Sequence, residues 1–419
     1  MPRPYEQSHP WLTFNLKQIN DMGPRSWLLM GEARSKCQHL AGVPLQPALA
    51  EELNRVTLIR GAQATTAIEG NTLTEAQVAG LLDGTYAAPP SRHYQEVEVR
   101  NLLDALDALD ALDALGAIDA EVQGGKYPRL TVDLIRDYNS KVLHGLDDQL
   151  NDGAVPGELR EHSVVVGPYR GAPADDCEFL LQRLCEWLEG PDFKNEDASI
   201  DFSLMLVRAM MAHLYLAWIH PFGDGNGRTA RLVEFLILAR SGKVPLPAAH
   251  LLSSHYNLTC DQYYRELDRA SKSSSIVDFV AYATERFVDG IRVEIDTVRQ
   301  QQLGVAWINY VNEVMSRYPS GKAADRQREL VLAMSTLGWL TQDEIKLITP
   351  AVAQTYARAE DRMVPRDLNR LIEAGLARKR RGTKATYQAC VDRMAAFMAP
   401  MHRPQNRMAT DDASPIRRP

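Results

Sequence analysis

An apolar run of sixteen residues, 204–219, constrains the fold of this 419-residue chain more than any other feature. Its apolar residues have helical spacing. Arg208 and His213 interrupt it, which makes it too polar and too short to span a bilayer. The helix should end at the His-Pro pair that follows, because proline disfavours helix for the residue before it. A second apolar run, 232–238, lies close behind. The sequence therefore predicts two helices joined by a short loop.

The connecting loop, residues 220–231, reads HPFGDGNGRTAR. The second helix can begin at Asn226 or Arg228, so that a glycine-rich turn opens directly into it. Such a turn directs free backbone N–H groups and the positive end of a helix dipole at one spot, which is an anion site. Around this spot stand polar side chains that suit phosphate chemistry with a metal: His220, Asp224, Arg228 and Arg231.

Composition limits the other possibilities. The length predicts two to three domains, and 45% hydrophobic with 24% charged residues is ordinary for a soluble globular protein. A net charge of −7 argues against general nucleic-acid binding by the whole chain. The five cysteines are scattered and form no CxxC, which supports neither a zinc site nor a disulfide framework. We expect a cytoplasmic protein without a membrane segment.

Upstream, a helix is predicted from Pro47 to Glu69, with Gly70 as its left-handed cap. Thr72 and Glu75 have the spacing of a capping box for the next helix. Glu69 is poorly placed, since a carboxylate in the last turn opposes the negative end of the helix dipole. It needs a cationic partner or full solvation, and a solvated glutamate is the simpler interpretation of this residue alone.

The middle of the chain predicts further helices and one hairpin. A helix over 93–122 carries a leucine every third residue from 103 to 115, and another helix follows over 130–146. Ser163–Gly167 is short and β-branched, and the Gly-Ala-Pro group at 171–173 suggests a hairpin. A lone hairpin in a helical domain can offer an exposed edge to an extended peptide, or can be incidental.

Residues 325–390 resemble a winged helix-turn-helix, with three helices over 328–337, 341–347 and up to Gly375, followed by a basic hairpin. The polar run 299–302 reads as a connector, and the Pro-Ser-Gly group at 319–321 as a domain boundary. The basic side chains that would neutralise DNA phosphates are Arg366, Arg370, Arg378, Lys379, Arg380, Arg381 and Lys384. Such folds also serve in protein contacts, and both interpretations stay open.

The loop matches the motif of the Fic (filamentation induced by cAMP) family, HPFx[DE]GNGRxxR, at every fixed position. The segment from Thr65 to Gly70 resembles the family's inhibitory pattern, [ST]xxxE[GN], and the hairpin resembles its flap. The resemblance covers about residues 50–290. It implies a mainly α fold, a Fic-type helical bundle with a β-hairpin flap, with the winged helix-turn-helix as a C-terminal addition.

The resemblance implies a role for each site residue. His220 is the general base, Asp224 binds Mg²⁺, and Glu69 pairs with Arg231 to hold the γ-phosphate of ATP out of its productive place. The residues implied in ATP and phosphate binding are Gly223, Gly225, Asn226, Gly227, Arg228 and Arg231, in inhibition Thr65, Glu69 and Gly70, and in target docking Val164, Val165, Val166 and Gly167. Tyr263 and Tyr264 are candidates for adenine contacts, with core packing as the alternative.

The implied reaction is transfer of AMP from ATP to a Ser, Thr or Tyr hydroxyl of a target protein, which includes the chain itself as a candidate. Three alternatives stay open. Kinase-type transfer is marked in the family by lysine at the position of Gly227. The other two are removal of AMP from a modified protein and a DNA-binding regulator with a Fic core. A homodimer also stays open.

The implied organisation is an N-terminal helical region over 1–120, with the inhibitory helix at about 47–70, and a catalytic core over 121–300. The winged helix occupies 320–392, and composition predicts a disordered tail over 404–419.

Overall fold

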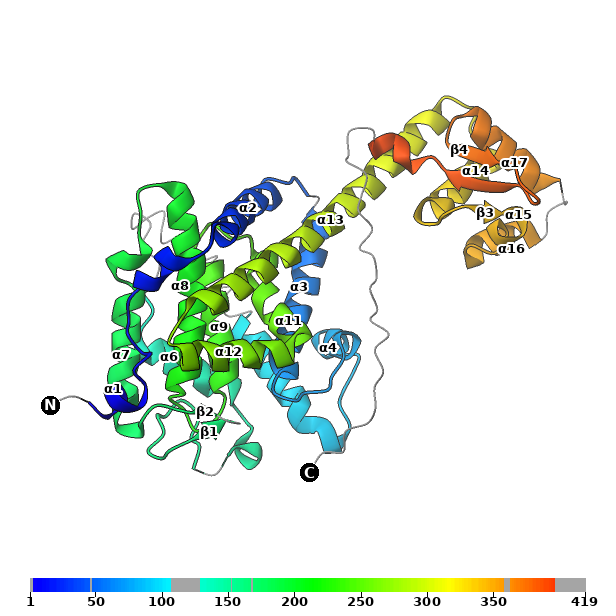
Figure 1. Cartoon of the computed structure of the whole chain (residues 1–419). Helices are drawn as coiled ribbons and strands as arrows, with labels where there is room; N and C mark the ends of the chain where they lie inside the picture. Colours follow the sequence, from blue (N-terminus) through cyan, green and yellow to red (C-terminus); the bar gives the residue numbers. More distant parts are fainter. Residues whose placement is uncertain are drawn as a thin grey trace, which may run out of the picture. The chain divides into compact units, whose positions relative to one another are not determined.

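The structure is a computed structural model that describes residues 3–45, 47–106, 129–151, 153–166, 169–357 and 362–395. The chain divides into two compact units, Met1–Asp296 and Thr297–Pro419. Both are mainly helical (Figure 1). The mainly α fold class is therefore confirmed.

The first unit is a helical bundle with a single small hairpin among its described residues (Figure 1). Residues 93–106 are also helical. The numbered helices of this unit are α1 (Pro4–Ser8), α2 (Pro24–Ala41), α3 (Pro47–Ala67), α4 (Glu75–Leu82), α6 (Val132–Val142), α7 (Cys177–Leu188), α8 (Ala198–Ile219), α9 (Asn226–Ala239), α10 (Leu246–Ala249), α11 (Leu251–Leu258), α12 (Cys260–Ser273) and the start of α13 (Val277–Ser316).

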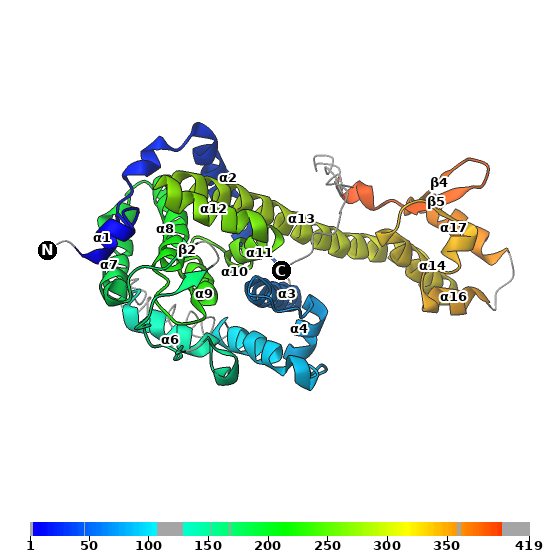
Figure 2. The same cartoon turned by 60° about the horizontal axis from the view of Figure 1, so that its bottom comes forward.

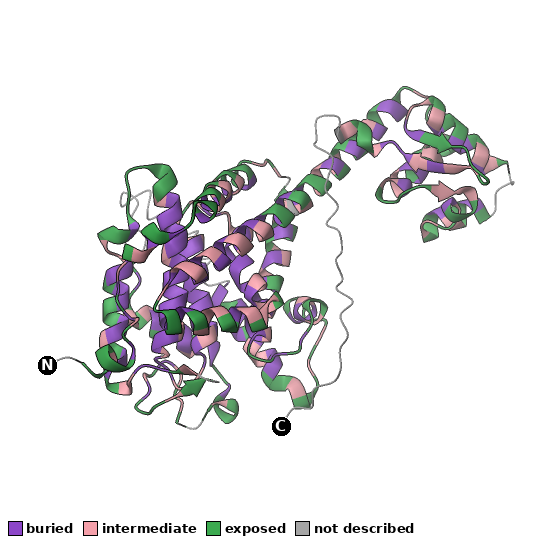
Figure 3. Cartoon of the chain, in the orientation of Figure 1, coloured by how far each residue is buried: buried purple, intermediate pink, exposed green. Residues whose placement is uncertain are grey.

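Helix α8 is the centre of this unit (Figure 3). It is apolar on all sides, and 89% of its most apolar stretch is buried, as expected of a core helix. It begins where the Asp197 carboxylate accepts hydrogen bonds from the backbone N–H groups of Ser199, at 2.7 Å, and Ile200. Helices α2, α7 and α9 pack against it. This packing fixes the end of α8, where the motif loop starts.

Helix α3 lies beside α4, α10 and α11 (Figure 2). Its close approach depends on Gly61, where a Cβ atom would overlap the imidazole of His250. Gly70 follows the helix in the left-handed region at φ 96°, as predicted. The predicted cap of the next helix was wrong, because Thr74 and not Thr72 precedes its first turn. The Thr74 side chain accepts from the Gln77 N–H, and the Gln77 side-chain oxygen accepts from the Thr74 N–H. Helix α4 therefore starts two residues later than predicted.

The hairpin consists of β1 (Val165–Val166) and β2 (Tyr169–Arg170), paired antiparallel. Two-residue strands are marginal by themselves. Side chains anchor the hairpin to the bundle: the Tyr169 hydroxyl donates to the Trp218 carbonyl at 2.7 Å, and the His9 imidazole lies 2.9 Å from the Arg170 carbonyl. The predicted hairpin is thus present, although Gly167 lies outside the described residues.

The middle helices differ from prediction mainly in length. The predicted helix over 93–122 is described only to residue 106, so the leucines from 109 to 115 lie outside the described residues. The predicted helix over 130–146 is shorter, because Thr131 caps the start of α6 and the helix ends at Val142.

The second unit has its own core, and Leu330, Met334, Leu368 and Tyr387 are buried in it. Its elements are the end of α13, then α14 (Lys322–Ala333), β3 (Leu340–Thr341), α15 (Gln342–Ile345), α16 (Pro350–Ala357), α17 (Met363–Glu373), β4 (Ala377–Arg380) and β5 (Thr386–Ala389). The strands form an antiparallel sheet in the order β3-β5-β4.

The polar run 299–302, interpreted as a connector, lies close to the division between the two units at 296/297. It is part of the continuous helix α13, since Arg and Gln are good helix formers. The predicted third helix is present as α17, which ends at Glu373, whereas the short helix α16 before it was not predicted.

Candidate active site

His220 closes α8 in a left-handed conformation, with φ 51° and ψ 57°. Such a conformation costs about 1–2 kcal/mol for a residue with a side chain. The following proline makes the helical alternative unfavourable. The imidazole Nδ1 lies 3.4 Å from the Ala217 carbonyl, which favours the tautomer with its proton on Nδ1. Nε2 is then the nitrogen that can accept a proton.

Burial lowers the pKa of His220 to about 4. The Ala217 carbonyl, Glu69 and Asp224 oppose this shift, while the positive charge of Arg160 adds to it. His220 is therefore neutral at physiological pH, which is the form that a general base requires.

Asn226 holds the loop in shape. Its side-chain oxygen accepts from the Phe222 N–H and its amide donates to the Phe222 carbonyl, both at 2.9 Å. Both residues are buried. The Asn226 side chain is thus committed within the loop, and only its backbone N–H remains for an anion.

The turn before α9 depends on glycine. Gly225 has φ 71°, and a Cβ there would come within 2.9 Å of the Leu143 side chain. A Cβ on Gly223 would lie 2.7 Å from the Ala154 Cα. Helix α9 starts at Asn226, so its first N–H groups have no acceptor within the helix. The predicted glycine turn that opens directly into a helix is thus present.

Asp224 is held at the start of this turn with its side chain 20% exposed. Its carboxylate accepts from the backbone N–H groups of Gly225 and Asn151, at 2.5 and 3.2 Å, and lies 3.3 Å from an Arg228 nitrogen. The described residues contain no group of three or more metal-binding side chains. Asp224 fits a Mg²⁺ ion that takes its remaining ligands from phosphate and water.

Arg228 is buried and pairs with Glu98 at 2.7 Å. The other Glu98 oxygen accepts from the Asn71 amide at 3.0 Å. Burial raises the pKa of Glu98, although Arg228 and Asn71 counteract it. Glu98 is a site residue that the sequence analysis missed, because it lies 130 residues from its partner and in no motif.

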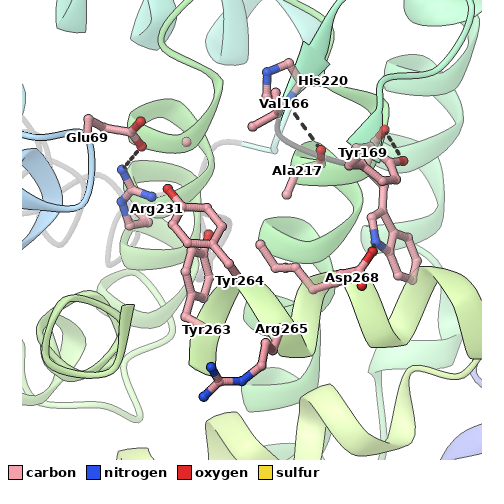
Figure 4. Close-up of a pocket in the computed structure, with 13 residues that line it drawn as sticks. Glu69, Val166, Tyr169, Ala217, His220, Arg231, Tyr263, Tyr264, Arg265 and Asp268 are labelled. Carbon is pink, nitrogen blue, oxygen red and sulfur yellow. Dashed lines mark hydrogen bonds and ion pairs between the residues drawn. The ribbon is translucent and has the colours of Figure 1, made fainter. Parts of the chain in front are cut away.

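Arg231 is 1% exposed, and the end of α3 supplies its partners. One guanidinium nitrogen lies 2.5 Å from a Glu69 carboxylate oxygen (Figure 4). The same nitrogen lies 3.0 Å from the Thr65 carbonyl. Burial raises the pKa of Glu69, but Arg231 outweighs it and leaves this pKa below its ordinary value. The cationic partner that Glu69 needs is thus present. Thr65 contributes its carbonyl and not its hydroxyl.

A buried polar group lies behind Arg231 and was not predicted. The Tyr256 hydroxyl donates to Glu234 at 3.0 Å, and His213 lies 3.5 Å from the other Glu234 oxygen and 2.9 Å from the Tyr263 hydroxyl. Burial raises the pKa of Glu234 well above its usual value and lowers that of His213 to about 3. Burial thus disfavours the charged form of both side chains.

A cavity of about 440 Å³ is bordered by the motif loop, the first turns of α9 and Glu69. Its lining includes His220, Glu69, Gly227 and Arg231. Figure 4 shows the Glu69–Arg231 pair on one side and His220 beside Val166 and Ala217. The rest of its wall is mainly apolar and comes from the hairpin and from α8 and α12: Val166, Tyr169, Ala217, Trp218, Tyr263, Tyr264, Arg265, Leu267 and Asp268.

The two predicted adenine contacts differ in position. Tyr263 is buried and stacks on Tyr256 at 4.7 Å, which is core packing. Tyr264 is 43% exposed, so its ring is the more accessible one. In the hairpin, Val165 and Val166 are exposed, and Val164 precedes them at the base.

The sequence profile of the Fic/DOC family matches residues 129–238. The chain carries a Fic domain. The match includes α6 to α9 with the motif loop and the hairpin, whereas α3 and Glu69 lie outside it.

Curated relatives of the chain are named protein adenylyltransferases. The fic-1 protein of Caenorhabditis briggsae is 30% identical over 182 residues, which are 43% of this chain and 32% of that protein. The Fic protein of Nematostella vectensis is 29% identical over 230 residues, 53% of this chain and 46% of that protein. The chain thus spans between a third and a half of the relatives it matches.

Solved structures share the fold. A Fic family protein from Desulfovibrio desulfuricans G20 superposes with a TM-score of 0.52 at 23% identity, covering 88% of this chain and 96% of that one. Residues 134–508 of Fic-1 from Caenorhabditis elegans superpose with a TM-score of 0.52 at 25% identity, covering 65% of this chain and 72% of that one.

Proposed function

We propose that this protein transfers AMP from ATP to a Ser, Thr or Tyr hydroxyl of a target protein, and that Glu69 restrains the reaction. The hydroxyl oxygen attacks the α-phosphorus, a P–O bond forms, and the bond to pyrophosphate breaks. His220 takes the hydroxyl proton on Nε2. The curated relatives, which carry the name of this activity, support the proposal.

One observation carries the proposal: a neutral imidazole and an anion-binding helix start face the same cavity. Arg228 and Arg231 would hold phosphate oxygens, since guanidinium groups bind them in a fixed geometry. Asp224 would hold Mg²⁺, which when bound neutralises phosphate charge. The apolar part of the cavity suits a base, with Tyr264 as its accessible aromatic side chain.

The restraint by Glu69 follows from where its carboxylate lies. A Cβ on Gly227 would overlap a Glu69 oxygen, so this carboxylate rests on the first turn of α9. It also occupies Arg231. A phosphate group would need both the first turn of α9 and the Arg231 guanidinium, and it would meet the negative charge of Glu69 there. Displacement of Glu69 would free the guanidinium and the helix start together.

The hairpin would align the target. Val165 and Val166 expose the short strand β1 beside the cavity, and an extended peptide can add to such an edge. A hydroxyl side chain of that peptide would then point toward His220.

The test is incorporation of α-labelled ATP by the wild type, Glu69→Gly and Glu69→Gly/His220→Ala proteins in lysate. Glu69→Gly should incorporate more label than the wild type, and the double variant none. Equal labelling of the wild type and Glu69→Gly would rule out the restraint. No labelling in any variant, with or without Mg²⁺, would rule out the transfer.

Two other reactions of the same site are separated by products. Kinase-type transfer would label proteins from γ-labelled ATP, and glycine at 227 argues against it. Removal of AMP would use water positioned by Glu69, and a purified adenylylated protein would then lose AMP with the wild type but not with Glu69→Gly. Intact mass of the protein itself after incubation tests self-modification, and light scattering tests a homodimer.

A second candidate function, nucleic-acid binding, rests on the charge of the C-terminal unit. We propose that α17 and the β4–β5 hairpin act as a winged helix. Residues 322–395 contain fourteen Lys and Arg against nine Asp and Glu, although the whole chain is acidic. Arg370 pairs with Glu373, and Arg378 pairs with Asp392. The exposed basic side chains without an ion-pair partner among the described residues include Arg366, Arg380, Arg381 and Lys384.

Binding of labelled duplex DNA at several salt concentrations tests this candidate. Arg366→Ala and Arg381→Ala should each weaken binding and reduce the salt slope by about 1, whereas Arg328→Ala on α14 should not. Binding that ignores salt, or no binding to any duplex, would leave a protein contact as the function of this unit.

A further inference from the structure

Arg160 is a buried guanidinium, 4% exposed, that lies beside the active site but belongs to none of its recognised motifs. Its Nε donates to the His220 carbonyl at 2.7 Å, and one terminal nitrogen donates to the His162 carbonyl at 2.6 Å. The other terminal nitrogen donates to the Ala172 carbonyl and approaches that of Ile219 at 3.4 Å. One side chain thus bonds to four backbone carbonyls.

The charge of Arg160 is not balanced by a carboxylate, since none among the described residues forms an ion pair with it. Burial lowers the pKa of Arg160, yet an arginine stays charged in proteins. The carbonyls of Ile219 and His220 end α8, where the negative end of a helix dipole stabilises a cation. The backbone therefore supplies the compensation that a buried charge requires.

The four carbonyls come from three places that must be in register. His162 precedes strand β1, Ala172 follows strand β2, and His220 is the predicted general base. Packing tightens the same junction: a Cβ on Gly171 would lie 3.0 Å from both an Arg160 nitrogen and the His220 Cβ. The Arg160 backbone N–H also donates to the Pro221 carbonyl at 3.0 Å.

We propose that Arg160 is a positioning residue whose hydrogen bonds link both sides of the hairpin to the backbone of His220. This link would align the hydroxyl of a docked target with the His220 imidazole. This inference rests on the proposed transfer reaction. The tie also supports the left-handed conformation of His220, because the carbonyl it holds belongs to that residue.

Arg160 has an electrostatic effect on the same imidazole. Burial is the main cause of the low pKa of His220, and the Arg160 charge lowers it further. Glu69 and Asp224 act in the opposite direction, and the other charged side chains that line the cavity are Arg231, Arg265 and Asp268. Loss of the Arg160 charge should raise the pKa of His220, whereas a lysine should keep it low.

Three substitutions in the Glu69→Gly background separate these effects. Arg160→Met removes the ties and the charge, and Arg160→Lys keeps the charge but not the fork of donors. Arg136→Met is the matched control, since exposed Arg136 donates to the Gly157 carbonyl of the same turn at 2.8 Å but does not reach His220.

Kinetics with a labelled target are the first readout. Both Arg160 variants should lose about 10²-fold in kcat/KM, with a higher KM for the target and an unchanged KM for ATP, because a misplaced general base and hairpin cost this order. Only Arg160→Met should also move the acid limb of the pH profile upward. Arg136→Met should stay within about twofold of the background.

Two measurements without turnover keep the inference testable on its own. Carbon-13 NMR of labelled histidine should show a higher His220 pKa in Arg160→Met only, and hydrogen exchange of residues 162–172 should be faster in both Arg160 variants. If Arg160→Met does not fold, the hydrogen exchange of residues 162–172 in Arg160→Lys tests the inference: faster exchange supports it, and unchanged exchange contradicts it.

The outcomes differ from those for the proposed function. No AMP transfer by Glu69→Gly would end the proposed function, while NMR and exchange still report on Arg160. AMP transfer with Arg160 variants that match Arg136→Met in KM, pH profile and exchange would overturn the inference.

Discussion

At the scale of single residues, the chemistry of the site is set by burial before any substrate binds. His220 lies at the end of a buried helix. The loss of hydration lowers the pKa of its imidazole by more than Glu69 and Asp224 raise it. The neutral form therefore persists into acid. A histidine with an ordinary pKa of about 6.5 would be about one-quarter protonated at pH 7, and its protonated fraction would not accept the hydroxyl proton.

The pH profile of Glu69→Gly should show this directly. The base works only when neutral, so the rate should be flat from pH 8 to about 6 and fall as the pH approaches about 4. The negative charge of Glu69 raises the pKa of His220. Its removal therefore lowers this pKa and moves the acid limb to still lower pH. Initial rates of AMP incorporation measure it, and a limb centred near 6.5 would contradict the lowered pKa of His220.

Asn226 should matter for stability as well as activity. Asn226→Ala removes both bonds to Phe222 and leaves two buried backbone groups unpaired, which costs about 1–3 kcal/mol for each group. Chemical denaturation compared with Asn195→Ala, an exposed asparagine that bonds the Asp197 N–H, measures the difference. Equal denaturation midpoints for the two variants would show that the Asn226–Phe222 bonds do not stabilise the protein.

At the scale of elements, the position of α3 decides whether Glu69 can reach Arg231. The contact of Gly61 with His250 lets the helix approach α10 and α11, and the imidazole of His250 is itself stacked on Phe235 at 4.2 Å. Glu69 follows the end of the same helix, so a change in its packing is transmitted to the ion pair.

Gly61→Val should therefore activate AMP transfer without altering Glu69. Its side chain cannot share the space of His250, and overpacking of this kind costs about 1–3 kcal/mol. Labelled AMP incorporation should rise toward that of Glu69→Gly. Gly31→Ala in α2, where a Cβ meets nothing within 4 Å, is the control and should leave the rate unchanged. A Gly61→Val protein that folds but stays at the wild-type rate would contradict this role of α3.

The sequence predicted those elements whose signals are local. The apolar run of α8, the glycine turn and the Gly70 cap each depend on neighbouring residues, and the structure contains all three. The full length of α13 and the separate helix α16 were missed, because polar residues neither end a helix nor mark a short turn. Glu98 and Arg160 were missed for another reason: their partners in the motif loop lie 130 and 60 residues away.

At the scale of the whole molecule, the two units differ in their titratable groups. All histidines except His402 belong to the first unit. His213 and His250 are buried, and burial lowers the pKa of each to about 3. In the unfolded chain these groups take up protons below about pH 6.5.

The first unit should therefore lose stability as the pH falls from about 6.5 toward 3. The unfolded state binds the extra protons, and each buried histidine contributes up to about 1.4 kcal/mol per pH unit within this window. Thermal unfolding between pH 7 and 5 should show one transition that moves and one, from the second unit, that moves little. His250→Phe should reduce the shift, and an unaltered shift would locate the protons elsewhere.

The pairing of Glu69 with Arg231 would also make the proposed restraint a measurable equilibrium. If the guanidinium alternates between the carboxylate and a phosphate, the wild-type rate reports the fraction of molecules in which the carboxylate has left. The ratio of the Glu69→Gly rate to the wild-type rate then gives the free energy of that departure, about 1.4 kcal/mol for each factor of ten. A ligand that bound α3 and raised the wild-type rate tenfold would have supplied this same amount, so the rate could serve to rank unknown activators.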